Sequence, residues 1–391
     1  MRLRLVWLLA VLCPAVVAFA QDRRAEGVLE RLFTDSLRAE WFAPAFLEQV
    51  APRQLEAIIN GLRAQYGSWL GARGAGTEFE VELERAWVPT QLVLDGQGRI
   101  AGLFFRPPQP KATTLEGWLE AFRALPGEVA LLVREGEREV LALEPERPLA
   151  VGSAFKLAIL AALKRDVQQG RRRWEEVLTL RAAHRSLPSG ILQNWPDGAP
   201  LTLYSLAALM ISLSDNTATD HLLALVGRDA VERISPRNQP FLSTREAFVL
   251  KNPENKAWLA RFRSATPQGR TAMLRELAAL PLPGESVFAS GPVAPDVEWF
   301  FTARELAVLL EEVADLPFFQ INPGPVRKAD WARVAFKGGS EPGVLNLSTH
   351  LVRPDGRRFT VIATWNGDQA LDEVRFVGLY SGLVRFLATL P

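Results

Sequence analysis

Three short stretches of the chain carry residue types that together can perform acyl transfer. In chain order they are Ser153-Ala154-Phe155-Lys156, Ser214-Asp215-Asn216 and Lys337-Gly338-Gly339. A serine hydroxyl becomes a strong nucleophile when a neighbouring base takes its proton, and a lysine amine is such a base once its pKa is lowered. Each stretch is short, so the neighbouring sequence must decide between a catalytic and a purely structural interpretation.

The first stretch opens a long apolar helix, which we predict from Ala154 to Gln169, before Gly170. Positions i and i+3 of a helix share a face, so the Lys156 amine is expected near the Ser153 hydroxyl. Burial among apolar neighbours would lower the pKa of Lys156 and make it a base at neutral pH. The N–H groups of a helix N-terminus also favour an anion formed at Ser153. The alternative is a capping serine followed by a solvated lysine.

The second stretch lies between predicted helices at 202–212 and 217–226. A second hydroxyl, Ser214, could pass a proton to a leaving group, and the Asn216 amide could hold an acyl-amide substrate. The alternative is a capping cluster for the following helix, because Ser, Asp and Asn are the preferred capping residues.

The third stretch follows the apolar residues 334–336 at the end of a predicted strand. A cation followed by glycines lets a substrate lie against the backbone while its carboxylate pairs with the Lys337 amine. The alternative is the start of a hairpin with an exposed lysine.

In this order, the stretches match the Ser-x-x-Lys, Ser-Asp-Asn and Lys-[Thr/Ser/Gly]-Gly motifs of class A β-lactamases and penicillin-binding proteins. Residues 113–391 therefore resemble this superfamily of serine hydrolases, and residues 24–105 resemble the small NTF2-like (cystatin-like) domains. The resemblance implies an α+β chain, whose C-terminal β-lactamase/transpeptidase-like fold has an antiparallel sheet flanked by helices. It also implies an acyl-hydrolase that needs no cofactor or metal.

The resemblance assigns a role to each matching residue. Ser153 would be the acylated nucleophile, Lys156 its activating base, and Ser214 the relay that protonates the leaving group. The expected substrate-binding residues are Asn216, Lys337, Gly338, Gly339 and Ser340.

The resemblance also implies an oxyanion hole and further roles for Lys337 and Asp215. The backbone N–H groups of Ser153 and Ser340 would form the oxyanion hole. Lys337 would bind a substrate carboxylate and keep Lys156 neutral through like-charge proximity. Asp215 would be structural.

The chain departs from the family pattern at two points. Gly338 replaces a Thr or Ser hydroxyl, which removes a hydrogen bond to a substrate carboxylate worth about 1.5–3 kcal/mol. The deacylating Glu-x-x-Leu-Asn pattern of class A enzymes is missing, and the nearest candidate for the deacylating residue is Glu246. The alternative for Glu246 is a capping box with Ser243.

The 391 residues are enough for two or three domains at about 150 residues each. We predict a helix-then-sheet domain at 24–105, a proline-rich linker at 106–112 and the hydrolase domain at 113–391. Strands at both ends of that last domain, with helices between them, indicate one sheet that joins its termini. The extra segment 252–295 is expected to rebuild the wall of the site.

Residues 1–20 have the pattern of a signal peptide with cleavage near Ala20, so we expect a periplasmic or secreted protein without a retained membrane anchor. Lipidation of Cys13 is the alternative, which the bulky Leu12 disfavours. Because Cys13 is the sole cysteine, the mature chain can form no disulfide and perform no thiol catalysis. The near balance of 45 Lys+Arg against 44 Asp+Glu argues against a nucleic-acid partner.

Other constellations of residues are weaker. The three histidines (His184, His221 and His350) are scattered, which argues against a Ser-His-Asp triad or a metal site, and His221 is expected at the surface or at a helix cap. Trp195 is equally suited to the core and to the rim of a substrate site. We predict an exported serine acyl-hydrolase acting on a small molecule, either a β-lactam, an ester or a peptidoglycan-like amide. The alternative is a non-catalytic or single-turnover penicillin-binding or sensor protein with a ligand-binding N-terminal domain.

Overall fold

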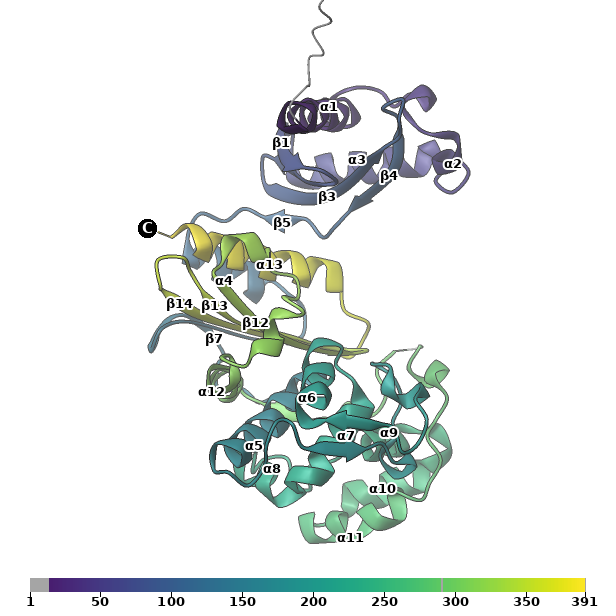
Figure 1. Cartoon of the computed structure of the whole chain (residues 1–391), viewed down its shortest axis with the longest axis vertical. Helices are drawn as coiled ribbons and strands as arrows, with labels where there is room; N and C mark the ends of the chain where they lie inside the picture. The colour runs from purple at the N-terminus through teal and green to yellow at the C-terminus, as the bar shows by residue number, and fades with distance from the viewer. Residues whose placement is uncertain (1–13, 290, 391) are drawn as a thin grey trace, which may run out of the picture. The chain divides into compact units, whose positions relative to one another are not determined.

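The computed structural model describes residues 14–289 and 291–390, which divide into two compact units (Figure 1). Unit 1 comprises the described residues up to Thr113 together with Val374–Gly382, and unit 2 comprises 114–373 and 383–390. Each unit combines helices with an antiparallel sheet, so the predicted α+β class is confirmed.

Unit 1 is a sheet with helices on its apolar side. The strands follow the chain in the order β1 (Trp69–Ala75), β2 (Glu78–Leu83), β3 (Ala86–Leu94) and β4 (Ile100–Phe105), all antiparallel. The helices that precede them are α1 (Pro14–Thr34), α2 (Pro44–Leu47) and α3 (Pro52–Tyr66). Apolar residues of α1, α3 and the strands form one buried cluster, which includes Leu29, Phe33, Ile59, Val81, Val88 and Ile100.

The proline-rich segment predicted as a linker is tied to this sheet. Residues Gln109–Pro110 form the short strand β5, which pairs with β3 through Trp87↔Gln109 and Ala86↔Pro110. Proline cannot donate to a strand ladder, so it is tolerated at a sheet edge such as this one.

Helix α1 begins at Pro14, so the predicted cleavage position near Ala20 falls within it. Cys13 and the rest of residues 1–13 lie outside the described residues. Within 14–289 and 291–390, no helix has both the length and the apolarity needed to span a membrane.

Unit 2 contains a five-stranded antiparallel sheet made from both ends of the unit. Its order is β12 (Arg333–Glu341), β13 (Val344–Val352), β14 (Arg358–Asn366), β6 (Glu128–Glu135) and β7 (Arg138–Leu143). Strand β14 pairs with β6 from Phe359↔Glu135 to Asn366↔Glu128. This pairing confirms the prediction that one sheet joins the termini of the domain.

Helices cover both faces of this sheet (Figure 1). Helix α4 (Leu115–Arg123) lies on one face, where its Trp118 ring is 6.3 Å from that of Phe386 in α13 (Glu373–Thr389). Helix α12 (Ala303–Val313) packs on the other face, against β13, β14 and β6.

The remaining helices surround α5 (Lys156–Gln168), which is buried from residue 156 to residue 164. A helix that is apolar on all sides must lie in a core. Its neighbours are α6 (Leu203–Ser212), α7 (Asn216–Val226), α8 (Arg228–Ile234) and α12, with α9 (Thr244–Lys251) against α7. The segment 252–295 contains two helices, α10 (Lys256–Ser264) and α11 (Pro267–Leu277). They are separate because a proline disfavours helical backbone at the residue before it.

Strand β12 lies against the short turn η2 (Gly152–Phe155) that precedes α5, and its closest approach is at Gly339. A Cβ atom added to Gly339 would lie 2.2 Å from Val151 O and 2.4 Å from Ser153 N. Glycine at 339 is therefore the residue that lets the strand reach the turn.

We predict that Gly339→Ala lowers the stability of the fold, because the added methyl group has no space between β12 and η2. Overpacking of this kind costs about 1–3 kcal/mol, and thermal unfolding would show it as a lowered Tm. Gly284→Ala is the matched control, since its Cβ would meet only Ser286 Oγ at 3.7 Å. Equal Tm values for the two variants would contradict the packing argument.

Candidate active site

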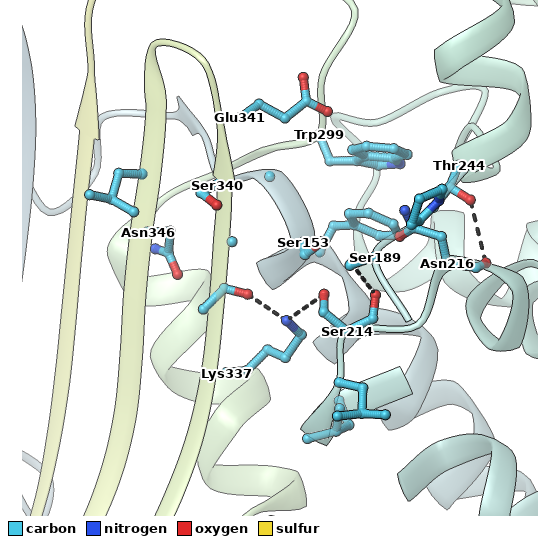
Figure 2. A pocket seen from close by; sticks show the side chains of 18 of the residues that line it. Ser153, Ser189, Ser214, Asn216, Thr244, Trp299, Lys337, Ser340, Glu341 and Asn346 are labelled. Carbon is cyan, nitrogen blue, oxygen red and sulfur yellow. Dashed lines mark hydrogen bonds between the residues drawn. The ribbon is translucent and has the colours of Figure 1, made fainter. Parts of the chain in front are cut away.

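The three predicted motifs meet at one cavity of about 600 Å³ in unit 2. Ser153, Ser214 and Lys337 line it, and Figure 2 shows them around the same part of the cavity. Ser153 lies in η2, one residue before Ala154, and its hydroxyl has no hydrogen-bond partner within the described residues. A hydroxyl without a protein partner, at a cavity wall, is free to meet a substrate carbonyl.

The amine of Lys156 is enclosed by oxygen atoms on the side of the second motif. Its Nζ hydrogen-bonds Asn216 Oδ1 at 2.6 Å, Ser214 Oγ at 3.0 Å and the backbone oxygen of Ser214. The side chain is 0% exposed. Burial, reinforced by the neighbouring charge of Lys337, lowers the pKa of Lys156 well below its usual value.

Ser214 lies between two lysines. Its Oγ is 3.0 Å from Lys156 Nζ and 3.1 Å from Lys337 Nζ (Figure 2). The residue has a φ of 57°, a left-handed conformation that non-glycine residues rarely adopt and that clusters at functional sites. The hydroxyl can therefore exchange a proton with either amine.

Asp215 holds this strained loop in place. Its carboxylate accepts N–H hydrogen bonds from Ile191 at 2.7 Å, Leu192 at 2.9 Å and Ala218 at 2.8 Å, the last as the N-cap of α7. Ser189 adds a hydrogen bond from its hydroxyl to Ser214 O at 2.8 Å. These contacts are what a structural role for Asp215 requires.

The third motif supplies the opposite wall. Lys337 of β12 is buried, and burial lowers the pKa of its amine to about 7. Gly339 lies against Ser153 N, and a Cβ added to Gly152 would lie 2.9 Å from Ser340 N. The N–H groups of Ser153 and Ser340 thus belong to the same small region of the cavity wall.

The packing around Gly338 explains why glycine occupies this position, where the family pattern has a hydroxyl-bearing residue. A Cβ at this position would lie 2.9 Å from Cζ of Phe336 and 3.2 Å from Asn346 O. Gly324 meets the same ring from another direction, where an added Cβ would lie 2.5 Å from it. The Phe336 ring therefore occupies space that a hydroxyl-bearing residue at 338 would need.

Glu246 has the capping role that the sequence left as its alternative. Ser243 and Glu246 form a capping box at the start of α9, with Ser243 N donating to Glu246 Oε2 at 2.7 Å. Arg228 donates to both carboxylate oxygens, at 2.9 and 3.1 Å. The residue is not among those that line the cavity, so we assign it no part in deacylation.

Several residues of the cavity wall were not predicted. They come from loops, strands and the first turn of α9, far apart in the sequence: Ser189, Thr244, Trp299, Phe336, Glu341 and Asn346. Trp299 stacks on Phe155 with ring centroids 3.8 Å apart, which fixes the turn that carries Ser153. From the extra segment 252–295, Glu285 and Phe288 of η6 (Glu285–Phe288) line the cavity, as the sequence predicted.

The prediction of a surface or capping position for His221 is wrong, because the side chain is buried. Its ring accepts a hydrogen bond from Arg181 N at 2.9 Å and lies 5.0 Å from the ring of His184. Trp195 is 38% exposed and does not line the cavity. Within 14–289 and 291–390, no three His, Cys, Asp or Glu residues are grouped to hold a metal ion.

Comparisons with known proteins relate part of the sequence to a family. Residues 113–286 match the sequence model of the beta-lactamase enzyme family, a segment that contains Ser153 and Ser214 and ends before Lys337. No curated protein sequence matches the chain.

Solved structures resemble a larger share of the chain. A β-lactamase from Sphaerobacter thermophilus is 23% identical, with a TM-score of 0.49, over 71% of this chain and 98% of that one. A β-lactamase from Chitinophaga pinensis is 18% identical (TM-score 0.45; 70% and 97% covered), and PBP-A is 15% identical (TM-score 0.47; 69% and 95% covered). Residues 113–286 of the chain are thus similar to the beta-lactamase enzyme family.

Proposed function

We propose that this protein is an exported serine acyl-hydrolase of the class A β-lactamase-like kind, which acts through an acyl-enzyme on Ser153. The observation that carries the proposal is the Lys156 amine, which is buried, lowered in pKa and hydrogen-bonded to the second serine of the site. Lys156 Nζ has no hydrogen bond to Ser153 in the structure, but it lies three residues along the chain from that unpartnered hydroxyl, and an amine with a lowered pKa can serve as the base of such a nucleophile.

Acylation follows from this arrangement. Lys156 takes the Ser153 proton as Oγ forms a bond to the substrate carbonyl carbon. The N–H groups of Ser153 and Ser340 stabilise the oxyanion of the tetrahedral intermediate. As the bond to the leaving group breaks, Ser214 gives its proton to that group and is reprotonated by Lys156, 3.0 Å away.

Two residues would orient the substrate. Lys337 would pair with a carboxylate while it is protonated, which suits β-lactams and peptides that end in a carboxylate. Asn216 uses Oδ1 for Lys156 and one Nδ2 hydrogen for Leu187 O at 3.0 Å, which leaves the second Nδ2 hydrogen for an acyl-amide oxygen. The proposed substrates are therefore β-lactams, esters or peptidoglycan-like amides.

Further parts of the proposal rest on the sequence. The pattern of residues 1–20 supports export to the periplasm or exterior. Helices packed on an antiparallel sheet support an NTF2-like domain for residues 24–105 and a hydrolase domain for 113–391.

A second function is favoured by one observation. Because Glu246 is engaged by Arg228 and the Ser243 cap, the site lacks the deacylating carboxylate of class A enzymes at that position. The alternative is a penicillin-binding or sensor protein that is acylated once and then stalls.

Intact-protein mass after addition of a chromogenic cephalosporin tests the proposal. We expect an adduct on the wild-type protein and none on Ser153→Ala. Colour that continues after the adduct forms would indicate hydrolysis, and a persistent adduct with colour that stops after about one equivalent would indicate the single-turnover alternative. An adduct that survives in Ser153→Ala would contradict the assignment of the nucleophile, and no adduct with any β-lactam or activated ester would contradict the proposed function.

The pH dependence of acylation tests the role of Lys337. Its amine is protonated below a pKa of about 7, so kcat/KM for a substrate with a carboxylate should fall as the pH rises through that value. A neutral ester should not show this fall, because it has no carboxylate for the cation to bind. Parallel profiles for the two substrates would contradict the role.

A further inference from the structure

A buried group of charges lies beside the cavity and takes no direct part in the chemistry proposed above. Lys251, the last residue of α9, donates from its amine to Glu298 Oε1 and to Glu341 Oε2. The side chain of Lys251 is 1% exposed, that of Glu298 is 0% exposed and that of Glu341 is 19% exposed. This Lys251 cluster (Lys251, Glu298 and Glu341) joins α9 to two segments that are far apart in the sequence.

The first of these segments supports the turn that carries Ser153. Glu298 directly precedes Trp299, whose backbone oxygen accepts the N–H of Val151, just before η2, at 3.1 Å. The Trp299 ring stacks on Phe155, the last residue of η2, with ring centroids 3.8 Å apart. The residue next to Glu298 therefore contacts the chain on both sides of Ser153.

The second segment carries the other N–H group of the oxyanion hole. Glu341 is the last residue of β12 and directly follows Ser340. A Cβ added to Gly152 would lie 2.9 Å from Ser340 N, so η2 and this end of β12 are in contact. Figure 2 shows Ser340 and Glu341 on the opposite side of Ser153 from Lys337. The Lys251 amine thus holds the carboxylate that follows one donor of the hole.

The Lys251 cluster depends on its cation. Burial alone would lower the pKa of Lys251, but the charges of Glu298 and Glu341 outweigh that effect and raise it, so the amine is protonated at neutral pH. Without the amine, Glu298 and Glu341 would be left as neighbouring like charges, with no cation to offset their burial. Removal of the cation should therefore displace the two segments that carry these carboxylates.

We propose that Lys251 is a positioning residue for the oxyanion hole, because its amine ties the segment that follows Ser340 to the segment that supports Ser153. The inference rests on the proposed Ser153 acyl-enzyme and deepens it. Lys251 does not line the cavity, so it acts on the reaction through the two carboxylates. The hole is effective only while both N–H groups lie within hydrogen-bond distance of the developing oxyanion.

Two measurements separate the oxyanion hole from general stability. Intact mass after rapid mixing and quenching gives the rate of acylation by a β-lactam. Infrared difference spectra with the same β-lactam, labelled with ¹³C at its reacting carbonyl, give the stretching frequency of the acyl ester. Hydrogen bonds from the two N–H groups polarise that carbonyl and lower its frequency. A change in stability alone would leave the frequency where it is.

Lys251→Met removes the cation and keeps the length of the side chain. We expect acylation to slow by about 10²-fold, because a displacement of about 1 Å in a catalytic geometry has this effect. The carbonyl frequency of the acyl-enzyme should rise, since the hydrogen bonds from the N–H groups are weakened. Lys251→Arg restores the cation and should recover part of the rate and part of the frequency shift.

Lys164→Met is the matched control. Lys164 is also a buried lysine, and its amine donates to Asp315 Oδ1 and Glu312 O. These partners lie at or just beyond the end of α12, and neither lines the cavity. We expect the wild-type acylation rate and the wild-type carbonyl frequency in this variant, whatever the change in its Tm.

Glu341→Ala is the second variant, which decides the question if Lys251→Met does not fold. It removes only the link to β12 and leaves the Lys251 amine paired with Glu298 in the core. We expect slower acylation and a higher carbonyl frequency than in the wild-type protein, because Ser340 is then no longer held from the residue that follows it.

Three outcomes would overturn the inference. The first is a wild-type acylation rate in folded Lys251→Met or, where that variant does not fold, in Glu341→Ala. The second is slower acylation with an unchanged carbonyl frequency, because the Lys251 cluster would then stabilise the fold without setting the oxyanion hole. The third is an equal loss in Lys164→Met. Each leaves Ser153 as the nucleophile, whereas absence of any adduct on the wild-type protein would contradict the proposed function itself.

Discussion

The burial of the Lys156 amine without a carboxylate partner is the constraint on which the rest of unit 2 depends. A second lysine, Lys251, is equally buried, yet its pKa is raised: burial alone would lower it, but Glu298 and Glu341 outweigh that effect. Lys156 contacts neutral oxygens of Ser214 and Asn216 instead, and its pKa is lowered. The partners, rather than the depth of burial, decide which lysine is a cation and which is a base.

The fold brings three distant segments to that amine. Helix α5 buries Lys156 because residues 157–163, which follow it, are apolar on all sides of the helix. The Asp215 cap holds Ser214 in a left-handed conformation beside it. Strand β12 approaches η2 because Gly339 has no side chain. Each of these three features is local, but the site forms only where the three segments meet. A change in any of them should therefore disturb acylation.

The sequence predicts those parts that repeat a local pattern. The apolar period of α5, the strands at both ends of unit 2 and the three motifs were all visible, because they depend on neighbours within a few residues. It does not predict Thr244 beside Asp220 or the Phe336 ring against Gly324, because those contacts join segments 12 or more residues apart. Glu246 shows that a local pattern can also be ambiguous. Its spacing from Ser243 fits both a capping box and a deacylating acid, and the position of Arg228 decides between the two roles.

The most direct test of the account is the titration of the Lys156 amine itself. The chain has only seven lysines, so the ¹³Cε resonances of selectively labelled protein can be followed by NMR, with Lys156→Met used to assign the signal. The account predicts that Lys156 titrates far below the usual lysine value of about 10.4 and that Lys251 does not. A Lys156 signal that titrates with the exposed lysines would contradict its role as the base.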